Sequence, residues 1–241
     1  MSKYYRKKAQ QGFSLVELMI AMMLGLLLLI GVSNLFIGSS QTYRLQEALF
    51  RVQESGRFAL DVIQRDLLNA GFQNVIPIGA NRDVDIVAVT GHPNSNPLPS
   101  AVINNGVASD ILQLNMNEFR DGAGTLVGDI YYYLAPDVSG ESSLYRNADA
   151  VVEGVEAIEF LYGVDTDGDR EPDSFNTRTA VGAGQWEDII AVRVSILVAA
   201  GGAGIVETAQ TPSAPFAAVD TSDRRMYQVF SNTIVLRNKM P

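Results

Sequence analysis

Residues 13–37 read FSLVELMIAMMLGLLLLIGVSNLFI, an apolar run in which Glu17 is the only charged side chain. As a helix, at about 1.5 Å per residue, this run is about 37 Å long, which is enough to cross the hydrocarbon of a bilayer. Residues 1–12, MSKYYRKKAQQG, hold four basic residues, whereas Arg44 is the first basic residue after the run. This asymmetry predicts a single membrane pass with the N-terminus in the cytoplasm and the rest of the chain outside.

Two ordinary interpretations of this segment fit less well. A secretory signal should show a small-residue cleavage site after a shorter apolar run, but here the helical pattern continues beyond Ile37. A plain membrane anchor leaves Glu17 unexplained, because a carboxylate at membrane depth costs about 2.5 to 3.5 kcal/mol and usually marks a function. The helix dipole favours an acidic side chain in the first turn by only about 0.3 to 1 kcal/mol. We therefore expect a functional role for Glu17.

Residues 12–17, GFSLVE, resemble the prepilin processing signal of the type IV pilin superfamily. In that family a dedicated membrane peptidase cuts after the glycine and then methylates the new N-terminal residue. The resemblance implies cleavage after Gly12, a methylated mature N-terminus at Phe13, and a contact of Glu17 with the N-terminal amine of a neighbouring subunit during assembly. In an apolar medium a cation and a carboxylate relieve each other's desolvation cost, which agrees with that contact.

Beyond the apolar run, the sequence predicts that the helix continues with one apolar stripe. The stripe positions follow three- and four-residue steps: Leu45, Leu49, Val52, Gly56, Ala59, Ile63, Leu67 and Ala70. On the opposite side, Glu47 with Arg51 and Asp61 with Arg65 have the spacing of favourable i,i+4 pairs. Gly71 is the predicted C-cap. The second part of the helix is therefore expected to bury its stripe on a domain.

After Gln73, short segments rich in β-branched and aromatic residues alternate with turn formers, which predicts strands of an antiparallel sheet laid on the helix. The predicted strands are 85–90, 110–116, 129–134, 143–146, 155–163, 189–198 and 226–236. Within the predicted strand 189–198, Arg193 and Ser195 alternate with apolar residues, as in a strand with one solvent-exposed face. The connection 201–224 is expected to be a mobile surface loop.

The predicted fold is therefore α+β and pilin-like, with a long N-terminal helix packed on an antiparallel β-sheet domain. The predicted parts are a cleaved basic leader over 1–12, a helix over 13–72 whose residues 13–37 span the membrane, and a β-rich domain over 73–241. The arrangement is similar to that of PilW-like minor pilins. That narrower likeness is carried by three later stretches: 162–165 (YGVD), 191–198 (AVRVSILV) and 233–238 (TIVLRN).

Residues 165–173, DTDGDREPD, place Asp165, Asp167, Asp169 and Asp173 at loop positions 1, 3, 5 and 9. Alternate aspartates can direct several hard oxygens at one Ca²⁺. The loop is not an EF-hand, because its glycine stands at position 4 and a glutamate is missing at position 12. The alternative is a solvent-exposed turn, since turns select Asp and Gly, although four close carboxylates repel one another without a cation. Calcium binding by these four aspartates is therefore a hypothesis.

Composition excludes several other classes of function. The formal charge is −9, and such an acidic body disfavours direct nucleic-acid binding. The chain has no cysteine and a single histidine, which removes disulfides, thiolate nucleophiles and Cys/His zinc sites. It also lacks a phosphate-binding P-loop and a GxSxG nucleophile elbow. We therefore expect a structural protein rather than an enzyme.

The resemblance implies a minor pilin that assembles with other minor and major pilins and with inner-membrane machinery. Its domain would be periplasmic before assembly and exposed on the pilus afterwards, in a fibre used for motility, adhesion or DNA uptake. A pseudopilin of a type II secretion system is the alternative within the superfamily, since it has the same leader and a similar fold. A calcium-dependent surface adhesin or binding module is the alternative from another class, and it would require residues 74–241 alone to bind a ligand.

Overall fold

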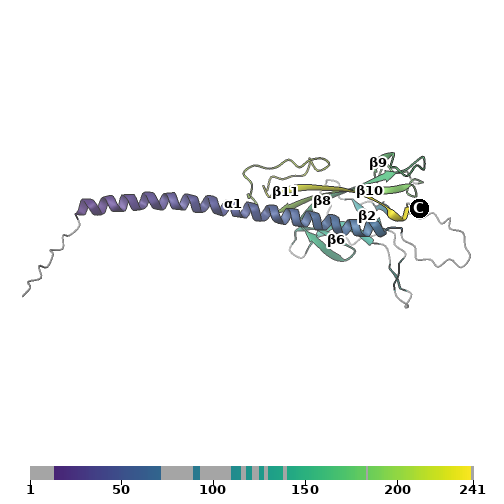
Figure 1. The fold of residues 1–241 in the computed structure, drawn as a ribbon, viewed down its shortest axis with the longest axis horizontal. Coiled ribbons are helices and arrows are strands. Elements are labelled where there is room, and N and C mark those ends of the chain that lie inside the picture. The colour runs from purple at the N-terminus through teal and green to yellow at the C-terminus, as the bar shows by residue number, and fades with distance from the viewer. Residues whose placement is uncertain are drawn as a thin grey trace, which may run out of the picture. The chain divides into compact units, whose positions relative to one another are not determined.

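The structure, a computed structural model, contains one long helix followed by antiparallel strands in the residues that it describes (Figure 1). The described residues are 14–71, 89–92, 110–114, 118–120, 125–127, 130–137, 140–182 and 184–239. The elements are α1 (Leu15–Asn69), β1 (Val89–His92), β2 (Ile111–Leu114), β3 (Glu118–Arg120), β4 (Thr125–Val127), β5 (Ile130–Pro136), β6 (Ser142–Arg146), β7 (Asp149–Glu153), β8 (Val155–Val164), β9 (Ser174–Thr177), β10 (Ile189–Ala200), β11 (Met226–Val235) and the 3-10 helix η2 (Arg237–Lys239). By their internal contacts the residues divide into two compact units, Met1–Arg44 and Leu45–Pro241.

In the first unit, α1 is apolar and exposed on every side. The side chains of residues 15–37 are all exposed. By length and composition the helix can cross a membrane, as the sequence predicts. Since so much apolar surface is unfavourable in water, this part of α1 requires lipid or other apolar helices around it.

In the second unit, α1 buries the predicted stripe from Val52 onward. The buried residues are Ala48, Val52, Gly56, Ala59, Ile63 and Leu67 in α1, and Ala70 just after its end. The prediction is wrong for Leu45, which is 39% exposed. Packing begins one turn later, where the Ala48 methyl group lies against Gly201 at the end of β10. The buried alanines lie eleven residues apart, and an eleven-residue repeat is close to the natural period of a straight helix.

The charged side and the end of α1 also follow the prediction. Arg51 binds Glu47 at 3.0 Å, and Arg65 binds Asp61. Gly71 has a φ of 74°, the left-handed conformation of a helix C-cap. The sequence pattern did not indicate that the amide of Asn238 donates to the Ala70 carbonyl at 3.0 Å, which ties the end of the chain to the end of the helix.

The strands form three antiparallel sheets rather than one. The orders are β1-β2-β5-β6-β7, β11-β10-β8-β9 and the hairpin β3-β4. The strand prediction is confirmed for β2, β5, β6, β8, β10 and β11, and of the predicted segment 85–90 only residues 89 and 90, in β1, are described. It misses four strands. These are the three-residue strands β3 and β4, and also β7 and β9, whose short and partly polar sequences, DAVVE and SFNT, carry little periodic signal.

The core lies where α1 faces both larger sheets. Its buried side chains come from α1, from β2, β5 and β6, and from β8, β10 and β11. Hydrogen bonds join the helix to each sheet, from Arg146 of β6 to Asp66 and from Asn232 of β11 to Gln64. These contacts fix the second part of α1 to the β-rich domain.

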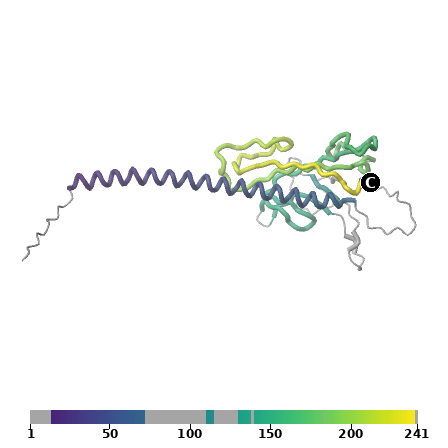
Figure 2. The backbone as a smooth tube through the Cα atoms, viewed as in Figure 1, coloured from purple at the N-terminus to yellow at the C-terminus, as the bar shows by residue number. Residues whose placement is uncertain are grey.

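Strand β10 is buried on both faces, so the prediction of one solvent-exposed face is wrong. Ser195 is only 6% exposed and shares a hydrogen bond with Ser231 of β11. At Arg193 this face is covered by Phe175 of β9, whose ring centroid lies 4.1 Å from the guanidinium carbon. At Leu197 it is covered by the connection 201–224, which folds back beside β11 (Figure 2) and inserts the fully buried Phe216 against Leu197 and its neighbours. This connection, here called the cap, is therefore packed on the sheet and is not a free loop.

Candidate functional site

The predicted processing site lies mostly outside the described residues, since Gly12 and Phe13 are not among them. Glu17 is described, and it lies exposed in the first turn of α1 among exposed apolar side chains. The first helical hydrogen bond runs from the Leu18 amide to the Ser14 carbonyl at 3.1 Å. Glu17 is thus three residues after the N-cap position, where the helix dipole favours an acid but water would be absent in a membrane.

A second polar centre holds α1 on the five-stranded sheet. One oxygen of Asp66 accepts hydrogen bonds from Arg146 Nε at 2.6 Å and from the Tyr132 hydroxyl at 2.5 Å. Burial, and then the bond to Asp66, raise the pKa of Tyr132, so this phenol stays protonated as a donor. The sequence pattern did not reveal this cluster, because its members are far apart in the chain. Its chemistry is that of a structural clamp.

A third polar centre fixes the cap to the four-stranded sheet. Arg225 binds Glu156 at 2.8 Å and Asp223 at 2.5 Å, and the Tyr227 hydroxyl donates to Asp223. Burial alone would raise the pKa of Asp223, but hydrogen bonds from Arg225 and Tyr227 lower it overall. Burial is also the main reason why the pKa of Tyr227 rises to about 12. Asp223 is therefore held as a carboxylate between two donors.

The half-buried carboxyl of Asp110 has a structural use of its own. Its amide donates to the Ile158 carbonyl and its Oδ2 accepts from the Phe160 amide, both at 3.2 Å, so it joins the start of β2 to β8. Burial raises the pKa of Asp110. Burial, and then the charge of Asp110, raise the pKa of Glu159. These bonds occupy Asp110 in holding the two larger sheets together.

The predicted calcium loop connects β8 to β9, and it brings three of its four aspartates together. One carboxylate oxygen from each of Asp165, Asp167 and Asp173 lies within 4.8 Å of the others. Asp169 is not in this group, and its Oδ1 accepts from the Glu171 amide at 2.8 Å. The group offers three of the six to eight oxygen ligands that Ca²⁺ takes.

Donors of the loop itself hold two of these carboxylates in place. The amides of Gly168 and Arg170 donate to Asp165 at 2.7 and 2.9 Å. The hydroxyl and amide of Thr166 donate to Asp173 and lower its pKa. Each oxygen of Asp165 accepts one such bond and keeps a second lone pair, whereas both bonds from Thr166 go to Oδ2 of Asp173 and leave its Oδ1 without either of them. The loop therefore presents ordered carboxylates at the surface.

Comparison with known proteins finds matches at both ends of the chain. The family model described as Prokaryotic N-terminal methylation motif matches residues 7–33, and the one described as Type IV Pilus-assembly protein W matches residues 131–238. Among solved structures, the chain is similar to the type IV-like pilin TTHA1219 from Thermus thermophilus, at 11% identity and a TM-score of 0.41, over 79% of this chain and 100% of that one. The comparison with curated proteins finds no match. The first family match includes Glu17 and the second includes the aspartate loop.

Proposed function

Because the chain is a type IV pilin of the PilW-like minor class, we propose that it is a structural subunit that helps to start pilus assembly. One observation carries this proposal. Helix α1 is exposed and apolar on every side over residues 15–37, yet buries a single stripe on the sheets from Ala48 onward. Such a helix can hold a domain at one end while its apolar part packs in lipid or among similar helices.

Processing is proposed to occur between Gly12 and Phe13, with methylation of Phe13. The match of the methylation motif to residues 7–33 supports this step. Cleavage creates a new amine next to an apolar segment, and the exposed carboxylate of Glu17 is the only charge in that segment. We propose that Glu17 of one subunit pairs with the new amine of a neighbour, because each charge relieves the other's desolvation cost.

The chain is proposed to cross the inner membrane once, with its N-terminus in the cytoplasm and its β-rich domain in the periplasm until assembly. The support is the excess of basic residues before the apolar run. One of the two matched families is described as a type IV pilus-assembly protein. The partners are proposed to be other minor and major pilins, the prepilin peptidase and the inner-membrane assembly machinery. The role is structural, without an enzymatic reaction.

Deletion of the gene tests the role in pilus assembly. The expected result is loss of surface pili, seen by electron microscopy, while protein export through a type II secretion system continues. Normal pili together with failed export would instead support a pseudopilin, the alternative within the superfamily. Complementation with the intact gene is the control.

We also propose that Asp165, Asp167 and Asp173 bind Ca²⁺, with the remaining ligands supplied by backbone carbonyls and water. The support is the grouping of three carboxylates within 4.8 Å in an exposed loop. Three negative charges at this spacing repel one another, and a divalent cation removes that repulsion. The predicted fourth ligand, Asp169, would lie outside this set. A bound ion would stiffen the connection between β8 and β9.

A further inference from the structure

Strand β11 is an outer strand of the four-stranded sheet, and one of its two edges faces away from the sheet. On the other edge it pairs with β10 from Met226 to Val235 without a register shift. The Leu236 amide, just past the strand, donates to the Ile190 carbonyl of β10. The Tyr227 amide instead donates to the side chain of Gln210 in the cap, at 2.8 Å. Since main-chain groups of successive residues point to opposite edges, the odd-numbered residues of β11 point away from β10.

The cap closes only the first part of this outward edge, at Tyr227. The residues beyond it whose main-chain groups point outward are Val229, Ser231, Thr233 and Val235. In the described part of the chain, no hydrogen bond other than those of the sheet involves the amide or carbonyl of these four. We call the four residues the β11 edge. It extends for about 20 Å at the rise of a strand and offers an unpaired row of donors and acceptors.

The other outer strands of the two larger sheets are protected from pairing, but β11 is not. Strands β1 and β9 have four residues each. Strand β7 has five, with Asp149 and Glu153 at its ends, and its pairing with β6 is irregular. Strand β11 has ten residues, regular pairing, and no charged residue or proline. A long, regular and uncharged edge is a template for pairing with another chain.

The side chains of the β11 edge suit a partner strand. Ser231 and Thr233 are exposed. Val235 is 44% exposed, and in the part of the chain that the structure describes it is the one large apolar side chain outside α1 that is exposed. Residues of this kind form favourable cross-strand pairs. When a strand is added to a sheet, main-chain hydrogen bonds supply affinity and alternate side chains supply specificity.

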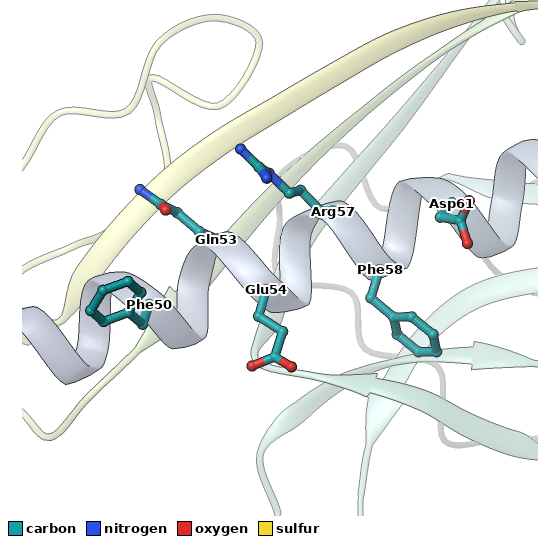
Figure 3. Close-up of a pocket in the computed structure, with 6 residues that line it drawn as sticks. All are labelled: Phe50, Gln53, Glu54, Arg57, Phe58 and Asp61. Carbon is teal, nitrogen blue, oxygen red and sulfur yellow. The ribbon is translucent and has the colours of Figure 1, made fainter.

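An unpaired arginine of α1 lies on the same side as β11. Gln64 of α1 accepts a hydrogen bond from Asn232 of β11 at 3.0 Å. Arg57 precedes Gln64 by seven residues, about two turns, so both lie on one side of the helix. Figure 3 shows Arg57 projecting from α1 on the same side as Gln53. Arg57 is exposed, and no described residue forms an ion pair with it. An acid on a strand beside β11 would therefore complement this charge.

We propose that the β11 edge binds an extended segment of a different protein, which adds to the sheet as an antiparallel strand. The segment has β-branched or aromatic side chains at alternate positions and one acid that faces Arg57. Antiparallel pairing continues the pattern of the sheet and is the more stable kind. The β11 strand of a second copy would supply no acid, because residues 226–235 are uncharged. The inference does not rest on the proposed function, since it needs only the folded β-rich domain.

The first test selects random nine-residue peptides, displayed on phage, on the full-length chain in detergent. The enriched peptides are expected to alternate apolar β-branched or aromatic residues and to share one acid. Ser231→Pro should bind synthetic copies at least about tenfold more weakly, because proline removes an outward amide and no bond to β10. Ser231→Ala is the matched control, since it loses the same side-chain bond to Ser195 but keeps the amide. It should bind the peptides within about twofold of the wild-type chain.

The second test reverses the charge of Arg57. Arg57→Glu should weaken binding of the enriched peptides about fivefold or more, and replacing the peptide's acid by lysine should restore it. A merely structural loss would not be restored in this way. Arg51→Glu changes an arginine that pairs with Glu47 on the charged side of α1, and it should alter binding by less than about twofold. This test decides the proposal even if Ser231→Pro fails to fold.

The absence of any enriched sequence would overturn the proposal, and so would equal binding to the wild-type chain and to a folded Ser231→Pro, or binding that Arg57→Glu leaves unchanged. The chain has no natural cysteine, so Val235→Cys tests for a second copy in oxidised membranes. The variant should remain a single chain, and a disulfide-linked species of twice the mass would overturn the proposal. The proposed function fails separately, if deletion of the gene leaves pili normal.

Discussion

Gly56 of α1 lies directly against the ring of Phe230 of β11. A Cβ placed on Gly56 would be 2.3 Å from Phe230 Cε2, far inside contact distance. The helix therefore approaches the four-stranded sheet as closely as it does because residue 56 has no side chain.

Gly56→Ala should destabilise the chain despite the better helix propensity of alanine. Overpacking a closed contact costs about 1 to 3 kcal/mol, of which about 1 kcal/mol is offset by the propensity. Urea unfolding of the full-length chain in detergent measures the difference. Gly38→Ala, at a helical glycine with nothing within 4 Å, is the control and should be neutral or stabilising. Adding Phe230→Leu to Gly56→Ala should recover part of the loss, and the absence of any coupling would contradict the contact.

Asp66→Asn should weaken the attachment of α1 to the five-stranded sheet. The change leaves Arg146 without its carboxylate, and a loss of about 1 to 2 kcal/mol of unfolding free energy is expected, because the Arg146 side chain is 36% exposed and partly screened. Asp61→Asn removes a fully surface pair with Arg65 and should cost less than about 0.5 kcal/mol. Similar losses for both variants would show that the clamp has no special role.

The periodicity of the sequence predicted those features of the fold that depend on residues close together in the chain. The buried stripe from Val52 to Ala70, the ion pairs on the charged side of α1 and the helix C-cap at Gly71 all follow from spacings of three to eleven residues. The bond between Asp66 and Arg146 joins residues 80 positions apart, and no spacing rule reaches that far. The packed cap was missed because Gly, Ala, Ser, Thr and Pro make up most of its sequence and give no periodic pattern, although Phe216 within it was an available signal.

The closeness of the aspartates in the candidate calcium site could likewise be predicted, because they belong to one short loop. Aspartates of one short loop are expected to lie near one another, and Asp165, Asp167 and Asp173 do. Asp169 is not in this group, and its two neighbours, Gly168 and Arg170, have φ values of 80° and 73°. Conformations of this kind depend on the whole loop, so the spacing of residues alone did not predict them.

Acid should weaken the cap through Asp223. Its pKa is lowered in the folded chain, so its contribution to stability is complete above the unfolded pKa, near 3.8, and is lost as the pH falls through the lower folded value. Asp223→Asn should therefore lower stability at pH 7 and flatten the fall in unfolding free energy below about pH 4. Urea unfolding at several pH values measures this. An unchanged slope in the variant would mean that other acids cause the fall.

Calcium should raise the melting temperature of the full-length chain. At a Ca²⁺ concentration about a hundred times the Kd, the expected rise is about 5 to 10 °C, measured by circular dichroism against a chelator. Asp167→Asn should abolish the rise, because Asp167 belongs to the group of three. Asp169→Asn should retain it. Equal melting temperatures with calcium and with chelator would reject the site, and loss of the effect in Asp169→Asn would reject this choice of ligands.

Gly12→Ala should leave the leader attached. The proposed peptidase must bring the bond after residue 12 into its site, and glycine allows a close backbone approach that a methyl group hinders. Intact-protein mass spectrometry of the full-length chain should find a wild-type protein that begins at methylated Phe13 and a variant that retains residues 1–12. Gly25→Ala, at an open position of α1, should be processed normally. A wild-type chain that begins at Met1 would remove the amine on which the proposed pairing with Glu17 depends.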